Sequence, residues 1–103
     1  MSEPLRVLVV EDEVELAAVI ISYFEHEGYL VDSAIDGPTA VELARAEQPD
    51  LIILDLMLPG FDGIEVCRQV RTFSNAYIQM KKFKTVFCVL CLCLMLLLFL
   101  QQK

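Results

Sequence analysis

The chain has 103 residues, which is enough for one hydrophobic core and one domain. Its net charge is −7, and all 15 acidic residues lie at or before Glu65, whereas half of the eight basic residues lie at or after Lys81. Because direct nucleic-acid binding depends on clustered basic residues, the acidic body argues against that function.

The amino end and the cysteine content indicate a cytoplasmic protein. The chain opens Met-Ser-Glu-Pro, with no basic stretch ahead of an apolar run, so no secretory signal peptide is predicted. Residues 1–80 contain a single cysteine, Cys67, which favours a reducing compartment and a role in core packing.

Strand and helix patterns alternate from the amino end. Short apolar runs predict strands, and apolar residues three or four positions apart predict helices. In chain order we expect a strand at Leu5–Val10, a helix at Glu13–Glu27, a strand at Tyr29–Ala34, a helix at Thr39–Glu47, a strand at Leu51–Leu54, a helix at Ile64–Thr72 and a strand at Ala76–Met80. This order, with short connections, predicts an α/β fold in which helices cover both faces of a parallel sheet of three to four strands.

Several residues mark the expected helix ends. Asp12 or Glu13 could cap the first helix, and Gly28 stands where a glycine commonly ends one. The turn Asp36-Gly37-Pro38 leads into the second helix. We interpret Asp62 and Gly63 as a turn and the start of the third helix.

Acidic residues stand where two of the apolar strands end. Glu11 and Asp12 follow the first strand, and Asp55 follows the third. In a parallel sheet, ligands bind beyond the carboxyl ends of the strands, so we expect the three acids in one crevice. Their mutual repulsion favours a bound cation such as Mg²⁺, which prefers oxygen ligands. Taken alone, Glu11 or Asp12 is better explained as a helix cap.

The motifs VLVVEDE and LIILDLMLPGFDGIEVCRQVR, with the Asp-Gly turn between them, resemble the receiver domain of bacterial two-component response regulators. The similarity runs from about Leu5 to Ile78, and it is strongest to receivers that precede winged-helix DNA-binding domains. It implies a flavodoxin-like, doubly wound sheet. It also implies a phospho-acceptor module, not an enzyme, that uses Mg²⁺ and takes its phosphoryl group from a histidine kinase in a phosphorelay.

The resemblance assigns roles to particular residues. Asp55 matches the phospho-accepting aspartate. Glu11, Asp12 and Asp55 match the metal site, with Asp12 favoured over Glu11 as the direct ligand. Met57 stands where the family supplies a metal-binding backbone carbonyl, and Pro59-Gly60 match the loop that follows.

The resemblance also implies two groups that the sequence does not supply. Receivers carry a Ser or Thr at the end of the fourth strand, and Lys82 falls at about that position. They carry a Lys at the end of a fifth strand, which cannot be placed here. We therefore interpret residues 1–80 as a partial receiver domain, truncated after about Ile78, whose switching output is impaired.

Residues 81–103 form a basic and then apolar tail. Lys81, Lys82 and Lys84 precede 15 consecutive apolar residues, Val86–Leu100. As a helix this run spans about 22 Å, short of the roughly 30 Å core of a bilayer.

Three interpretations of the tail stay open. Residues 83–100 form a short anchor that tethers the body to the inner face of the membrane, a helix packed on the sheet, or a strand paired with its edge. The alternative functions are accordingly a membrane-attached interaction module or decoy, and a nonfunctional truncation product. The tail cysteines are better explained as apolar side chains than as zinc ligands.

Overall fold

A computed structural model of the chain describes residues 4–56, 58 and 62–81. The strands are β1 (Arg6–Val10), β2 (Leu30–Ala34), β3 (Leu51–Asp55) and β4 (Tyr77–Lys81), and the helices are α1 (Val14–His26), α2 (Gly37–Glu47) and α3 (Gly63–Val70). Every element expected in this part of the chain is present, and no end differs from its expected position by more than two residues. The expected apolar helix beyond residue 81 lies outside the described residues.

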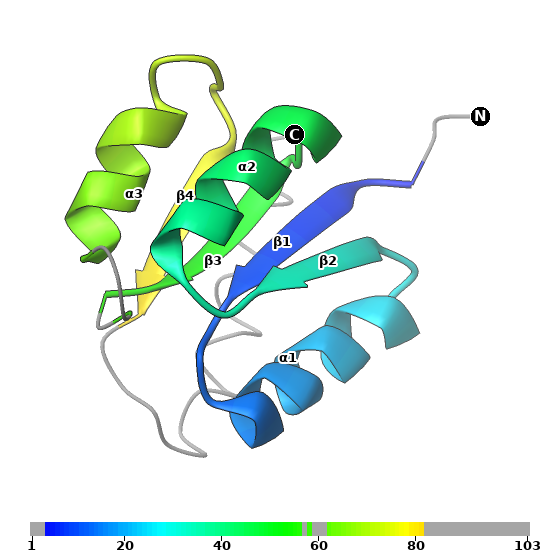
Figure 1. Cartoon of the computed structure of the whole chain (residues 1–103). Coiled ribbons are helices and arrows are strands. Elements are labelled where there is room, and N and C mark those ends of the chain that lie inside the picture. Colours follow the sequence, from blue (N-terminus) through cyan, green and yellow to red (C-terminus); the bar gives the residue numbers. More distant parts are fainter. Residues whose placement is uncertain (1–3, 57, 59–61, 82–103) are drawn as a thin grey trace.

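The four strands form one parallel sheet in the order β2-β1-β3-β4. This order is that of the flavodoxin-like, doubly wound arrangement, so the expected fold class is confirmed. Figure 1 shows α1 on one side of the sheet and α2 with α3 on the other. The direction of each crossover decides this division, because a right-handed connection that moves one way along the sheet uses one face only.

The sheet separates two hydrophobic cores. On the α2 and α3 side, small helix residues such as Ala40 and Ala44 pack against Leu8, Ile52 and Leu54. On the α1 side, the large side chains Ile20 and Phe24 pack with strand residues that point the other way. The two central strands are therefore apolar at nearly every position, as expected where a strand is buried on both faces.

Asp50 joins three strands at the amino end of the sheet. Its Oδ2 accepts a hydrogen bond from the Arg6 amide at 2.9 Å, and its own amide donates to the Arg6 carbonyl at 2.8 Å. Its carbonyl accepts from the Tyr77 amide at 3.0 Å. These bonds align β1, β3 and β4 before the ladder begins, and so help to set the register of all three.

Capping groups explain where the helices begin and end. Asp36 Oδ1 accepts from the Thr39 amide at 2.8 Å, which starts α2 two residues earlier than apolar spacing predicted. Asp62 caps α3 through the Glu65 amide in the same way, as expected from the turn there. Glu13 is the N-cap of α1, although its side chain makes no capping hydrogen bond. Gly28 follows α1 with φ +93°, a conformation that favours glycine.

Cys67 is partly buried against the core under α3, as the sequence predicted. Among the residues that the structure describes, no helix combines the length and apolar character needed to cross a bilayer. The expected anchor at residues 83–100 lies outside them.

The Asp36 cap generates a prediction about pH. The hydrogen bond from the Thr39 amide holds the pKa of the Asp36 carboxyl below its ordinary value of 3.8. A pKa that is depressed by folding stabilises the fold above the unfolded-state value, and this contribution is lost as the pH falls through the folded-state value. The natural chain should therefore melt at a higher temperature than Asp36→Ala at pH 7, and the difference should shrink in acid.

The matched variant is Asp36→Asn, which keeps the accepting oxygen but cannot titrate. Its melting temperature should exceed that of Asp36→Ala by an amount that does not depend on pH. The measurement is a series of thermal melts followed by circular dichroism. A difference between the natural chain and Asp36→Ala that is unchanged well below pH 3.8 would contradict the proposed role of the charge.

Candidate functional site

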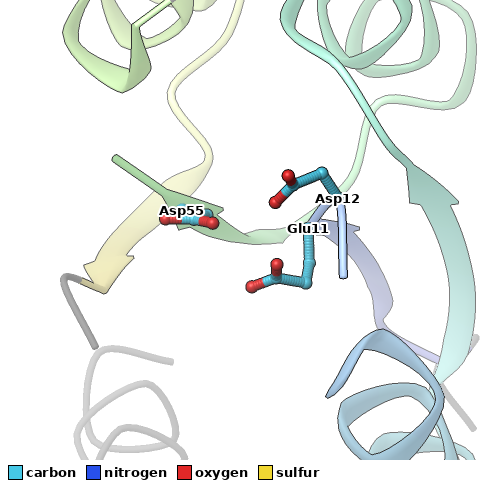
Figure 2. A group of neighbouring side chains, drawn as sticks. All are labelled: Glu11, Asp12 and Asp55. Atoms are coloured by element: carbon cyan, nitrogen blue, oxygen red, sulfur yellow. The ribbon is translucent and has the colours of Figure 1, made fainter. Parts of the chain in front are cut away.

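Glu11, Asp12 and Asp55 meet at the carboxyl edge of the sheet. β1 and β3 are adjacent and pair Val10 with Leu54, so the next residue of each strand path is an acid. Figure 2 shows the three carboxylates gathered in one region, two from the end of β1 and one from the end of β3. One oxygen from each residue lies within 4.8 Å of the others. The three acids that the sequence predicted to lie together therefore form one acidic cluster.

The three acids differ in burial. Glu11 is 0% exposed and Asp55 is 1% exposed, whereas Asp12 is partly exposed. Burying carboxylates costs free energy, and placing like charges together adds to this cost unless opposite charge is supplied. A site of this kind stores unfavourable electrostatic energy that a cation can relieve.

Glu11 has a structural role within the site. Its Oε2 accepts a hydrogen bond from the Glu13 amide at 2.9 Å, and its own amide donates to the Ala34 carbonyl at 3.0 Å. The first bond closes the turn between β1 and α1, and Asp12 lies in that turn. One Glu11 oxygen is therefore engaged by the backbone.

The donor set fits a small, hard cation. Two oxygens on one Mg²⁺ ion are about 2.9 to 4.2 Å apart, since each Mg–O distance is about 2.1 Å. The separation of up to 4.8 Å among the three carboxylates is close to this size. Mg²⁺ commonly keeps several waters beside one or two carboxylates. The residues present would therefore hold such an ion with little movement of the chain.

Three positions named by the sequence lie outside the described residues. These are Met57, whose backbone carbonyl was expected to bind the metal, and the loop residues Pro59 and Gly60. Lys82 also lies outside them. The backbone of its neighbour Lys81 is described: this residue ends β4 and is the Cα partner of Asp55 in the β3–β4 ladder. The fourth strand thus delivers a lysine to the sheet edge beside Asp55.

Gly63 positions α3 against the strand end that carries Asp55. A Cβ at this residue would lie 2.8 Å from the Leu56 Cα and 3.1 Å from the Asp55 carbonyl oxygen. The Gly63 amide also donates to the Leu56 carbonyl at 3.2 Å. The sequence predicted a turn and a helix start here but did not predict this close approach. The available signal was a glycine directly after an N-cap residue.

Known proteins share this fold and motif set. The pattern of the response regulator receiver domain family matches residues 7–84. Chemotaxis protein CheY4 of Vibrio cholerae is similar in structure with a TM-score of 0.75, at 28% identity over 81% of this chain and 72% of that one. The BeF3-activated N-terminal receiver domain of Klebsiella pneumoniae RstA has a TM-score of 0.71, at 31% identity over 80% and 71%.

A third similar structure contains a metal. The receiver domain of a sensor histidine kinase from Pseudomonas aeruginosa has a magnesium ion coordinated in its active site cleft; its TM-score is 0.71, at 31% identity over 76% of this chain and 66% of that one. The chain spans 66% of the length of a similar response regulator from Chloroflexus aurantiacus and 56% of a similar coiled-coil fusion protein.

The acidic cluster predicts a specific response to Mg²⁺. If the ion binds the folded chain alone, it should add about 2.7 kcal/mol to the free energy of unfolding at about 100 times its dissociation constant. Asp12→Asn should be more stable than the natural chain in the absence of the ion, because it removes one repelling charge, and should respond weakly to the ion. Urea melts with and without Mg²⁺ measure both effects. Equal responses of the two chains would contradict a site that uses Asp12.

The close approach at Gly63 predicts two linked losses. Gly63→Ala should lower the free energy of unfolding by about 1–3 kcal/mol, because the added methyl group meets backbone atoms that cannot move away cheaply. It should also weaken Mg²⁺ binding, since α3 and the end of β3 must separate. Gly28→Ala is the matched control: its strain comes from the positive φ alone, with no atom within 4 Å. It should cost about 1–2 kcal/mol and leave the affinity for the ion unchanged.

Proposed function

We infer that this chain, which belongs to the response regulator receiver domain family, accepts a phosphoryl group on Asp55 from the phosphohistidine of a histidine kinase in two-component signalling. The observation that carries the inference is the position of Asp55: it is buried at the end of a central strand and shares an edge with two further carboxylates. A carboxylate there has no packing role, and its charge is costly unless it serves chemistry.

In the proposed step, an oxygen of Asp55 attacks phosphorus in line with the bond to the histidine nitrogen. A phosphorus–oxygen bond forms and the phosphorus–nitrogen bond breaks. The nitrogen leaves with the electron pair and takes up a proton. The product is an acyl phosphate on Asp55, and no other side chain of the described residues needs to form a covalent bond.

The other acids prepare this step. Asp12, held on the turn that Glu11 closes, would bind Mg²⁺ together with Asp55, and the Met57 backbone carbonyl is proposed as a further ligand. The bound ion would offset negative charge that three carboxylates and a phosphoryl group bring together. Glu11 acts mainly by holding Asp12 in place, because one of its oxygens accepts the Glu13 amide. The proposal assigns the protein a phospho-acceptor role and not a classical enzymatic one.

We propose that phosphorylation of this chain has a reduced signalling output. The motifs resemble those of receivers that precede winged-helix domains, and we propose that this chain derives from a regulator of that type. β4 brings Lys81 to the sheet edge beside Asp55, and Lys82 follows it in the sequence. Lys82 falls at about the position where the resemblance implies a Ser or Thr. A hydroxyl that follows the phosphoryl group would then be missing, so we propose weak coupling to output.

That same edge favours a second candidate function. A receiver that accepts phosphoryl groups without passing on a conformational change would compete for a kinase and lower the phosphorylation of its other targets. In this role the chain acts as a decoy in the cytoplasm. Attachment to the membrane through residues 83–100 would add proximity to a membrane-bound kinase.

Labelling the full chain tests phosphoryl acceptance. With Mg²⁺ and radiolabelled acetyl phosphate, we expect a covalent label that hydroxylamine releases, as an acyl phosphate requires. Chelation of the metal should reduce the label strongly, and Asp55→Asn should abolish it. Asp36→Asn is the control, because it removes a carboxyl that caps α2 and does not belong to the acidic cluster. Label that persists in Asp55→Asn, or that is lost equally in Asp36→Asn, would contradict Asp55 as the acceptor.

A further inference from the structure

The positive charges of the described residues are unevenly placed with respect to the acidic cluster. Five lysine and arginine residues lie in residues 4–56, 58 and 62–81. Four are arginines whose side chains contact other groups: Arg6 pairs with Glu47, Arg68 with Glu65, Arg45 lies over the ring of Phe73, and Arg71 donates to the Ser74 carbonyl. The fifth is Lys81, which ends β4 at the carboxyl edge of the sheet.

The register of the sheet sets how far the charge of Lys81 lies from the site. Lys81 is the Cα partner of Asp55, on the strand next to β3 (Figure 1). Neighbouring strands are about 4.8 Å apart, and a lysine stem is about 6 Å long. For any conformation of a lysine side chain, the ammonium therefore lies within about 11 Å of the Asp55 Cα.

At such a distance the two charges affect each other. The screening length at physiological ionic strength is about 8 Å, and buried charges are screened less than exposed ones. Asp55 is 1% exposed and Glu11 is 0% exposed, so little water stands between these carboxylates and a neighbouring charge. A positive charge at Lys81 thus acts on the whole acidic cluster and not on Asp55 alone.

A lysine at this position also has a simpler explanation. β4 is the outer strand of the described sheet, and lysines on outer strands discourage pairing with other chains. That role requires a charge on the strand but no particular register. It predicts no effect on the binding of a cation at the carboxyl edge, so the two explanations are separable by experiment.

We propose that Lys81 is a resident counter-charge of the acidic cluster. Its charge offsets part of the repulsion among Glu11, Asp12 and Asp55, so it stabilises the chain when no metal is bound. A divalent cation binds the cluster by neutralising the same negative charge, and Lys81 therefore weakens that binding. The inference rests on the proposed function for the site and its cation, but it needs no phosphoryl transfer.

Mg²⁺ titrations of the full chain by calorimetry test the proposal. Lys81→Gln removes the charge and keeps a side chain of similar character, and it should bind Mg²⁺ about three- to tenfold more tightly, as expected for one charge acting on a divalent ion about 10 Å away. Lys81→Arg keeps the charge and should match the natural chain. Arg71→Gln is the matched control: it removes one positive charge after the far end of α3, where the arginine contacts the Ser74 carbonyl.

Urea melts without divalent ions provide a second measurement, because they do not involve the metal. Lys81→Gln should lower the free energy of unfolding, and the loss should be smaller when Asp12→Asn has already removed one carboxylate. Such a difference between the two backgrounds measures the coupling of the two charges. A lysine that only protects the strand edge would give the same loss in both.

Each outcome decides the proposal. Equal or weaker Mg²⁺ binding by Lys81→Gln would overturn it, as would an equal gain in Lys81→Arg or in Arg71→Gln. If Lys81→Gln does not fold without the ion, Asp12→Asn combined with Lys81→Gln should fold, because the charge balance is restored; an unfolded double variant would overturn the proposal. Failure of the Asp55 labelling experiment would leave these results unaffected, so the two proposals fail separately.

Discussion

The parallel pairing of β1 with β3 is the constraint on which the rest of the molecule depends. The register that joins Val10 to Leu54 brings Glu11 and Asp55 side by side and carries Asp12 with them. This arrangement is electrostatically unfavourable in isolation. It persists because the same two strands contribute buried apolar side chains to both cores, so moving the acids apart would break the packing on each face of the sheet.

The architecture was predictable because its signals are local and repeated. Apolar runs of strand length alternate with helical spacing, and this pattern admits few topologies. The helix boundaries were harder to predict where a cap outweighs apolar spacing. α2 begins at Gly37 because Asp36 accepts the Thr39 amide, whereas the apolar pattern alone starts two residues later. The sequence pattern after Ile78 was interpreted as a departure from the receiver family, yet the family match continues to residue 84.

The site was predictable in its residues and less so in its internal organisation. Glu11, Asp12 and Asp55 follow apolar strands directly, and parallel strands align their carboxyl ends, so their meeting could be expected. The bond from the Glu13 amide to Glu11 and the close approach of Gly63 to Leu56 could not, because both depend on the path of the backbone through a turn. Spacing in the sequence does not encode that path.

Asp50 helps to align the strands at the end of the sheet that lies away from the three carboxylates. Its hydrogen bonds to Arg6 and Tyr77 lie at the amino ends of the strands, a full strand length from the three carboxylates. A register slip of one residue would turn every strand side chain to the wrong face, and these bonds oppose it without any contribution from the acidic edge. Substitutions at the carboxyl edge can therefore change the chemistry of the site without misaligning the sheet.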